Sequence, residues 1–137
     1  IQAGRIMLDR IKNLILRGED FAFETTLATK SYIHLIKEAQ ANGYFVTLVY
    51  FWLNSADLAI KRVKERVSNG GHNIPEDIIK RRYAGGIQNL SKIYIPQVDN
   101  WFIVNSSDQL LKLVAEGKHN SNTNIYIPDI YTKIISQ

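Results

Sequence analysis

Four arginines in two short stretches are the residues of this sequence best suited to chemistry: Arg62, Arg66, Arg81 and Arg82. A guanidinium group binds phosphate oxygens with two parallel hydrogen bonds, and an arginine brought into place neutralises the charge that develops during phosphoryl transfer. From Lys61 to Arg82 there are seven basic and three acidic residues, a net charge of +4 that equals the charge of the whole chain. This segment therefore predicts a cationic element that closes on an anion such as a phosphate chain. A solvated charged face is the alternative.

A pair of glycines separates the two basic stretches. Gly70 and Gly71 cost stability unless the backbone there needs a positive φ or must move, so their position predicts a turn or hinge between two helices. His72 follows the glycines and can either contact a phosphate or only cap the loop. With three histidines and no cysteines in the chain, we expect no metal site built from protein nitrogen and sulphur ligands.

Polar side chains form a second candidate group because they follow apolar runs that read as strands. In open parallel sheets, ligands bind beyond the carboxyl ends of the strands. A carboxylate beside two hydroxyls suits a hydroxylated substrate or the water molecules of a magnesium ion, although strands also simply end in polar turn residues. For Asn54, capping of the following helix is the simpler role. The candidates are Glu24, Thr25, Thr26, Asn54, Asn105 and Ser106.

Helices and strands are predicted to alternate along the chain, which is typical of an α/β layered domain with a mainly parallel sheet. The apolar run at 44–53 predicts a strand that is covered on both faces. The helix that begins at Pro75 is expected to loosen near Gly85 and Gly86. The predicted helices span about 2–17, 30–41, 55–69, 75–94 and 107–115, with a short one from 128, and the predicted strands span 21–26, 44–53, 101–104 and 125–127.

Composition places the chain among globular proteins. Its 137 residues are 45% hydrophobic and 22% charged, which is one domain's worth and excludes a disordered polymer. The absence of cysteine excludes disulfides and thiol nucleophiles, and no apolar run is long enough for a membrane span. We expect a cytoplasmic protein. The sequence opens at Ile1 inside a helical pattern, without an initiator Met, so we also expect a part of something longer.

Several blocks of the sequence resemble the zeta-toxin-like P-loop kinases, bacterial proteins often labelled as predicted ABC-type ATPases. These blocks are AGRIMLDRI, FAFETTL, WFIVNSS and the stretch RVKERVSNGGHNIPEDIIKRRY at 62–83. The resemblance covers nearly the whole chain and weakens in a tail at 116–137. It implies one partial kinase domain over 1–137, a three-layer α/β/α fold with a mainly parallel sheet, and a helical-hairpin lid at about 58–95.

The resemblance also implies an activity, the transfer of a phosphoryl group from ATP, with Mg²⁺, to a hydroxyl of an unidentified small molecule. An antitoxin or a second chain is a possible partner, whereas a membrane or a nucleic acid is not expected. Carried over residue by residue, the implied catalytic arginines are Arg66 and Arg82. The implied lid contacts to phosphate are Arg62, Arg81 and His72, the substrate-facing residues are Glu24 and Thr25, and the residues near the adenine are Asn105 and Ser106.

This sequence departs from the family pattern at one decisive motif. The family begins with a strand, a GxxxxGK[ST] loop and a helix, and no such loop occurs here. Without it there is no backbone nest for the β-phosphate and no hydroxyl ligand for magnesium, so we expect the chain alone to be inactive. The absent strand should lie between those at 21–26 and 44–53, leaving a seam that closes by direct pairing, by a partner chain, or not at all. A basic nucleic-acid-binding or protein-interaction module without catalysis is the alternative, since the sequence pI is about 9.3.

Overall fold

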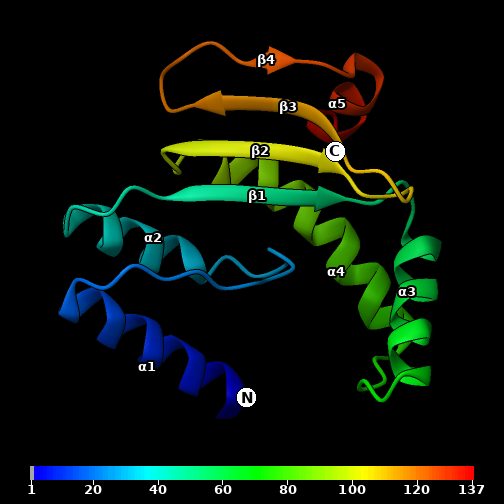
Figure 1. The fold of residues 1–137 in the computed structure, drawn as a ribbon, viewed down its shortest axis with the longest axis horizontal. Coiled ribbons are helices and arrows are strands. Elements are labelled where there is room, and N and C mark those ends of the chain that lie inside the picture. The colour runs from blue at the N-terminus through cyan, green and yellow to red at the C-terminus, as the bar shows by residue number, and fades with distance from the viewer. Residues whose placement is uncertain (1) are drawn as a thin grey trace.

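The computed structural model describes residues 2–137 and places them in a curved sheet with helices packed beneath it (Figure 1). Within this described part of the chain there are five α-helices, one π-helical turn (η1) and four strands. Their bounds are α1 Gln2–Arg17, α2 Tyr32–Ala41, β1 Thr47–Trp52, α3 Ala56–Ser68, α4 Glu76–Asn89, η1 Leu90–Tyr94, β2 Asn100–Asn105, β3 Lys112–Lys118, β4 Asn124–Ile125 and α5 Pro128–Ile135.

Five of the six predicted helices are confirmed. Gly18 follows α1 with a φ of +68°, the left-handed conformation expected of a glycine that caps a helix. Ser55 caps α3, because its hydroxyl oxygen accepts a hydrogen bond from the backbone N–H of Leu58 at 3.1 Å. Pro75 is the residue before α4, which carries Glu76 in its first turn. No helix within residues 2–137 is long and apolar enough to cross a membrane.

The sheet has the order β1-β2-β3-β4. Only β1 and β2 run parallel, in the register Thr47↔Asn100, whereas β2 with β3 and β3 with β4 are antiparallel. The prediction of a mainly parallel sheet is therefore wrong for the described residues. The reason is topological: the chain returns from β2 through a short loop as a hairpin, and no helix lies in between for a parallel crossover.

The helix predicted at 107–115 is also wrong, because strand β3 begins at Lys112. Leu, Lys, Ala and Glu favour helices, but pairing with β2 buries Val114 and Ala115 completely in the core. Gly117 lies directly against the indole ring of Trp101, and an added Cβ would come within 2.6 Å of that ring. Tertiary packing thus overrides the local helix preference of this segment.

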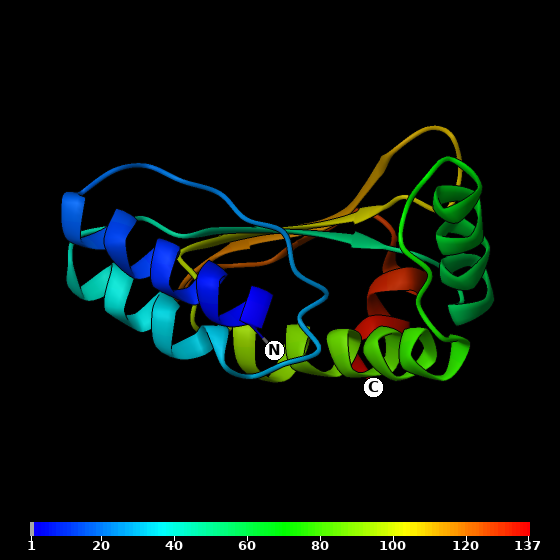
Figure 2. The same cartoon turned by 90° about the horizontal axis from the view of Figure 1, so that it is seen from below.

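The helices cover only one face of the sheet. Figure 2 shows α1, α2, α4 and α5 on the same side, with α3 beyond the end of the strands. The core between these layers contains Tyr94, Leu90, Ile103, Val98 and Val114 as fully buried side chains. The predicted three-layer arrangement, with β1 covered on both faces, is therefore wrong for this part of the chain.

The predicted strand at 21–26 is absent: these residues form an extended segment without ladder hydrogen bonds. The physical reason is that β1 is the edge strand of the sheet, and no neighbouring strand is available to pair with the segment. Phe21 instead packs edge-on against the Tyr44 ring, with ring centroids 5.8 Å apart. The seam expected at this edge is therefore not closed by direct pairing.

Candidate functional site

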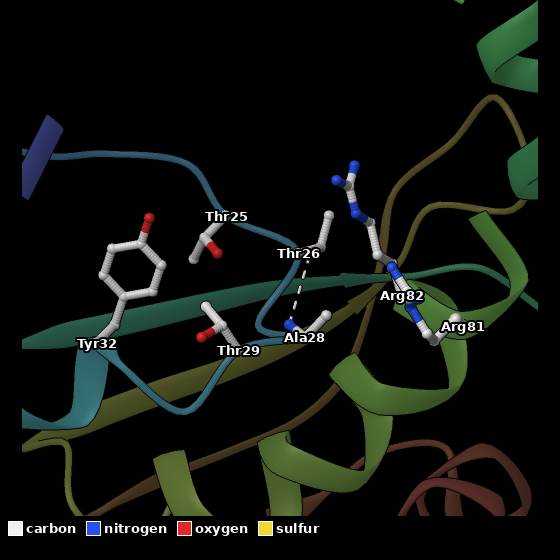
Figure 3. A pocket seen from close by; sticks show the side chains of 7 residues that line it. All are labelled: Thr25, Thr26, Ala28, Thr29, Tyr32, Arg81 and Arg82. Atoms are coloured by element: carbon white, nitrogen blue, oxygen red, sulfur yellow. Dashed lines mark hydrogen bonds between the residues drawn. The ribbon is translucent and has the colours of Figure 1, made fainter. Parts of the chain in front are cut away.

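A cavity of about 370 Å³ lies between the loop that follows the extended segment and the middle of α4 (Figure 3). Its lining is rich in hydroxyl groups and contains two arginines but no acidic residue. Residues 25–29, the cavity loop, and Tyr32 at the start of α2 supply the hydroxyl groups, and α4 supplies the arginines. The lining residues are Thr25, Thr26, Ala28, Thr29, Tyr32, Arg81 and Arg82.

The loop makes two short turns that orient its threonines. The hydroxyl oxygen of Thr25 accepts a hydrogen bond from the backbone N–H of Leu27 at 3.2 Å, and that of Thr26 accepts from Ala28 N–H at 3.4 Å. Because each oxygen already accepts a bond, its hydroxyl hydrogen is free to donate to a ligand. Between these turns Leu27 is buried with a φ of +60°, a conformation that non-glycine residues adopt at a cost and that is frequent at functional sites.

Two side chains from the helix layer hold this loop in place. The amide nitrogen of buried Asn89 donates to the Leu27 carbonyl oxygen at 2.8 Å, and the Tyr94 hydroxyl donates to the Thr29 carbonyl oxygen at 2.6 Å. Neither residue was among the sequence candidates. For Asn89, the sequence signal was its position on the apolar face of the helix. A polar side chain buried there almost always has a hydrogen-bond partner.

Gly85 and Gly86 allow α4 to approach the same loop closely. A Cβ on Gly86 would overlap the carbonyl oxygen of Thr26, whereas one on Gly85 would make ordinary contacts of 3.8 Å with Ala28. The helix runs without interruption through both glycines, so the expected loosening is wrong. Close packing of the backbones accounts for Gly86, and the arginines one turn earlier are thereby fixed relative to the threonines.

Replacing Asn89 with alanine is expected to lower the free energy of unfolding by about 1–3 kcal/mol, because the Leu27 carbonyl would be left buried without a donor. Chemical denaturation checks this value. Gln88→Ala, on the exposed side of the same turn, is the matched control and should change stability by less than about 0.5 kcal/mol. Equal stability of the two variants would contradict the role assigned to Asn89.

Two tyrosines, Tyr50 of β1 and Tyr83 of α4, are neutral groups. The Tyr83 hydroxyl donates to the Leu53 carbonyl oxygen at 2.7 Å, and the Tyr50 hydroxyl lies beside Gly86. Burial raises the pKa of Tyr50 and of Tyr83, and the proximity of Tyr83 adds to the rise at Tyr50. Both phenols therefore stay protonated near neutral pH.

The remaining lid residues are placed differently from Arg81 and Arg82. Arg62 donates to the carbonyl oxygens of Ser106 and Ser107 at 2.6 and 3.3 Å, which ties α3 to the loop after β2. The two sequence candidates Arg62 and Ser106 thus meet each other outside the cavity. Four further candidates do not line the cavity either: Glu24, Arg66 and His72 are exposed, and Asn105 turns its side-chain oxygen to the N–H of Ser107 at 3.0 Å.

Replacing Arg62 with methionine is expected to lower the free energy of unfolding by about 1–3 kcal/mol, because two carbonyl oxygens lose a charged donor. The exposed neighbour Lys61→Met serves as the control and should leave stability within about 0.5 kcal/mol. Thermal and denaturant unfolding measure both. Wild-type stability of the Arg62 variant would show that this tie does not hold α3.

The turn at the tip of the lid accounts for its two glycines. Gly70 has a φ of +94°, and the N–H of Gly71 donates to the Arg66 carbonyl oxygen at 2.7 Å. A Cβ on Gly71 would lie 2.8 Å from that oxygen. Below the turn, Lys64 and Glu76 form an ion pair at 3.0 Å, and the hydrogen bond from Lys64 lowers the pKa of Glu76. Turn geometry, rather than a need for motion, is sufficient to explain the Gly-Gly pair.

The site fits phosphate groups better than it fits a metal ion. Two guanidinium groups and free hydroxyl hydrogens are donors for anionic oxygens. In the described part of the chain, no three His, Cys, Asp or Glu side chains gather in a way that could hold a metal. The residues therefore match the phosphates of a nucleotide or a phosphorylated substrate but not a complete Mg²⁺ site.

Comparison with known proteins identifies the class. The zeta toxin family model matches residues 1–117, so the chain belongs to the zeta toxin family, a kinase-like P-loop family. The match includes the extended segment, the cavity loop and the whole α3–α4 hairpin.

The chain is also similar to an uncharacterised protein of Haemophilus influenzae (strain Rd). The two are 40% identical over 83 residues, which are 61% of this chain and 59% of that protein. The match covers a little over half of the relative. Since 83 residues are 59% of that protein, its length is about 140 residues. No solved structure matches the chain.

Proposed function

We propose that this chain forms the substrate side and the lid of an ATP-dependent kinase that transfers a phosphoryl group to a hydroxyl of a small molecule. The observation that carries the proposal is the cavity lined by Arg81, Arg82 and several hydroxyl groups in a member of the zeta toxin family. Phosphoryl transfer depends mainly on positioning and on neutralising the charge of the transferring group. Arg81 and Arg82 lie about one helical turn before Gly86, where α4 packs closely against the Thr26 carbonyl oxygen. This contact fixes the positions of the two arginines, which suits them to that task.

The roles of individual residues follow from their positions. Arg82 and Arg81 bind phosphate oxygens from the α4 side, and Thr25 and Thr26 donate hydroxyl hydrogens from the loop side. Arg66, which we propose as a second catalytic arginine, is on α3, and His72 is in the turn between α3 and α4; both are exposed and neither lines the cavity.

Three further roles stay proposals on the resemblance. Glu24 precedes the cavity loop and is proposed to contact the hydroxyl-bearing substrate. Asn105 ends β2 and Ser106 follows it, and both are proposed to lie near the adenine. Arg62, which is hydrogen-bonded to Ser106, would then support this nucleotide side of the site.

ATP with Mg²⁺ is proposed as the phosphoryl donor, although residues 1–137 contain no GxxxxGK[ST] loop to hold its β-phosphate. We therefore propose that these residues alone do not turn over ATP. The proposed setting is the bacterial cytoplasm, where ATP is available, and an antitoxin or a second chain is the proposed macromolecular partner.

An extended protein tests the proposal. In this extended protein, the strand, the GxxxxGK[ST] loop and the helix of a full-length zeta toxin family kinase are fused ahead of residue 1. We expect it to release ADP from ATP in the presence of a hydroxyl-bearing acceptor, such as a nucleotide-linked sugar, while residues 1–137 do not. A folded extended protein that consumes no ATP with any acceptor in a panel of sugars, nucleosides and their phosphates would rule the kinase function out.

A further inference from the structure

The cavity between the loop at 25–29 and α4 has two chemically different ends. Figure 3 shows Arg81 and Arg82 at one end and Tyr32 at the other, with the threonines between them. Two guanidinium groups make the first end cationic, whereas the phenol ring brings a flat and largely apolar group to the second end. The contents of the filled cavity must therefore be anionic at one end and planar or apolar at the other.

The ring of Tyr32 is held in place by its neighbours. Its centroid lies 5.0 Å from that of the Phe23 ring, at an interplanar angle of 38°. Its hydroxyl donates to Met7 Sδ at 3.7 Å, on α1. Phe23 is itself 36% exposed, so the two rings together form an aromatic surface that solvent reaches. Planar ligand rings pack well against aromatic side chains that are fixed in this way.

The side chains that line the cavity offer many hydrogen-bond donors and few acceptors. Arginine has only donors, and no Asp, Glu, Asn or Gln is among the described residues of the lining. The hydroxyl oxygens of Thr25 and Thr26 already accept from the loop backbone. The hydroxyl oxygen of Thr29 likewise accepts from the N–H of Ser31 at 3.2 Å. A ligand of this cavity must therefore supply the acceptors itself.

The backbone carbonyl oxygens of the loop do not make up for this shortage. The Leu27 carbonyl accepts from Asn89, and the Thr26 carbonyl packs against α4. The Thr29 carbonyl accepts from Tyr94. A free monosaccharide would bring several hydroxyl donors that find no acceptor here, and each unpaired donor weakens binding. A nucleobase suits the site better, because its carbonyl oxygens and ring nitrogens are acceptors on a planar ring.

The size of the cavity sets an upper limit on the ligand. Sites for small molecules typically enclose about 300–1,000 Å³, and the volume here, about 370 Å³, is near the lower end of that range. The transferring phosphoryl group must occupy part of this space beside the arginines. The remainder suits a nucleoside, whereas a nucleotide-linked sugar adds a diphosphate and a second sugar ring.

We propose that the cavity binds a nucleoside as the phosphoryl acceptor, with the base against Tyr32 and a ribose hydroxyl toward Arg82. This inference rests on the proposed function and narrows its acceptor to one chemical class. The ribose hydroxyl oxygen forms a bond to the γ-phosphorus of ATP, and the bond from that phosphorus to the departing ADP breaks. The hydroxyl proton is released to solvent, and the products are a nucleoside monophosphate and ADP.

Nucleoside binding can be measured without ATP, because all lining residues of the cavity belong to residues 1–137. The probes are adenosine, guanosine, cytidine and uridine, titrated into the chain and followed by NMR. We expect at least one of them to shift the signals of residues 25–29 and Tyr32 to saturation. Glucose should cause no shift, and uridine diphosphate glucose should bind at least tenfold more weakly than that nucleoside. In the complex, the ring protons of Tyr32 should show nuclear Overhauser effects to the base.

Variants of Tyr32 separate the aromatic ring from the hydroxyl. Tyr32→Phe keeps the ring and should bind the nucleoside within about twofold of wild type. Tyr32→Leu keeps an apolar side chain without the ring and should weaken binding about fivefold or more, since stacking on an aromatic side chain contributes that much. Tyr126→Leu is the matched control because Tyr126 is 54% exposed and does not line the cavity, so this variant should bind as wild type does.

Several results would overturn the nucleoside assignment. These are the absence of nucleoside binding, equal binding of glucose, tighter binding of uridine diphosphate glucose, and unchanged affinity of a folded Tyr32→Leu variant. If that variant does not fold, the contact between Tyr32 and the base in the wild-type complex decides, and its absence would overturn the assignment.

The nucleoside site and the kinase function can fail separately. Phosphorylation of a sugar but of no nucleoside by the extended protein would keep the kinase function and refute the nucleoside acceptor. Nucleoside binding that depends on Tyr32, in an extended protein that consumes no ATP with any acceptor, would keep the binding site and refute the kinase function.

Discussion

Replacing Gly86 with alanine should lower the free energy of unfolding by about 1–3 kcal/mol, although alanine is the better helix former. The added methyl group would overlap the Thr26 carbonyl oxygen, so α4 and the cavity loop must separate. Because this contact sets the position of Arg82 relative to Thr25, the extended protein with this substitution should also lose most of its ATP turnover. Denaturant unfolding and ADP release are the measurements.

The neighbouring glycine provides an internal control. At Gly85 the methyl group would meet Ala28 at an ordinary contact distance of 3.8 Å. Gly85→Ala is therefore expected to leave stability unchanged or to raise it by up to about 1 kcal/mol, the usual gain in a helix interior. If both variants were equally stable, the close approach of the two backbones at Gly86 would not exist in solution.

Replacing Arg82 with alanine in the extended protein should lower kcat roughly 100-fold or more, with a smaller effect on KM. In the proposed kinase, the guanidinium group would neutralise charge that develops on the transferring phosphoryl group, and arginines in such positions contribute about 10³-fold or more to phosphoryl transfer. Since the Arg82 side chain is exposed and lines an open cavity, the substitution should not unfold the protein. Steady-state kinetics with ATP and the active acceptor measure both constants.

Lys80→Ala is the matched control because Lys80 is an exposed cation on the same helix that does not line the cavity. It removes the same charge from the hairpin and should keep kcat within about twofold. An Arg82 variant with nearly full kcat would exclude Arg82 from transition-state stabilisation. Equal losses in both variants would point instead to the overall charge of the hairpin.

Local sequence signals were sufficient for most of the helices, including the two of the α3–α4 hairpin. The helix-end signals depend only on local backbone geometry or on the adjacent turn. They lie at the predicted ends of α1, α3 and α4, at Gly18, Ser55 and Pro75. The strand runs at 44–53 and 101–104 were equally clear, because β-branched and aromatic residues dominate them.

Elements that depend on distant partners were not predictable in the same way. The segment 107–115 has helix-forming residues and becomes a strand because β2 is beside it. The segment 21–26 has a strand-like sequence and remains unpaired because no strand is beside it. A single sequence carries no direct information about which neighbours are present, so both interpretations failed for the same physical reason.

The candidate site was predictable in part. Thr25, Arg81 and Arg82 line one cavity, so the structure brings these three candidates together. The support beneath them was not foreseen: Asn89 and Tyr94 bond to the loop backbone, and Gly86 fits against it. Such residues act through contacts with the main chain, which the sequence pattern of one helix does not reveal.

We propose that residues 1–137 carry the substrate side and the lid of a zeta toxin family kinase and that these residues do not hold nucleotide unaided. Calorimetric titration with Mg-ATP tests it most directly, with residues 1–137 and the extended protein measured side by side. We expect saturable binding by the extended protein and none by residues 1–137. Absence of binding by a folded extended protein would contradict the claim, and the cationic hairpin would then be tested against RNA at several salt concentrations.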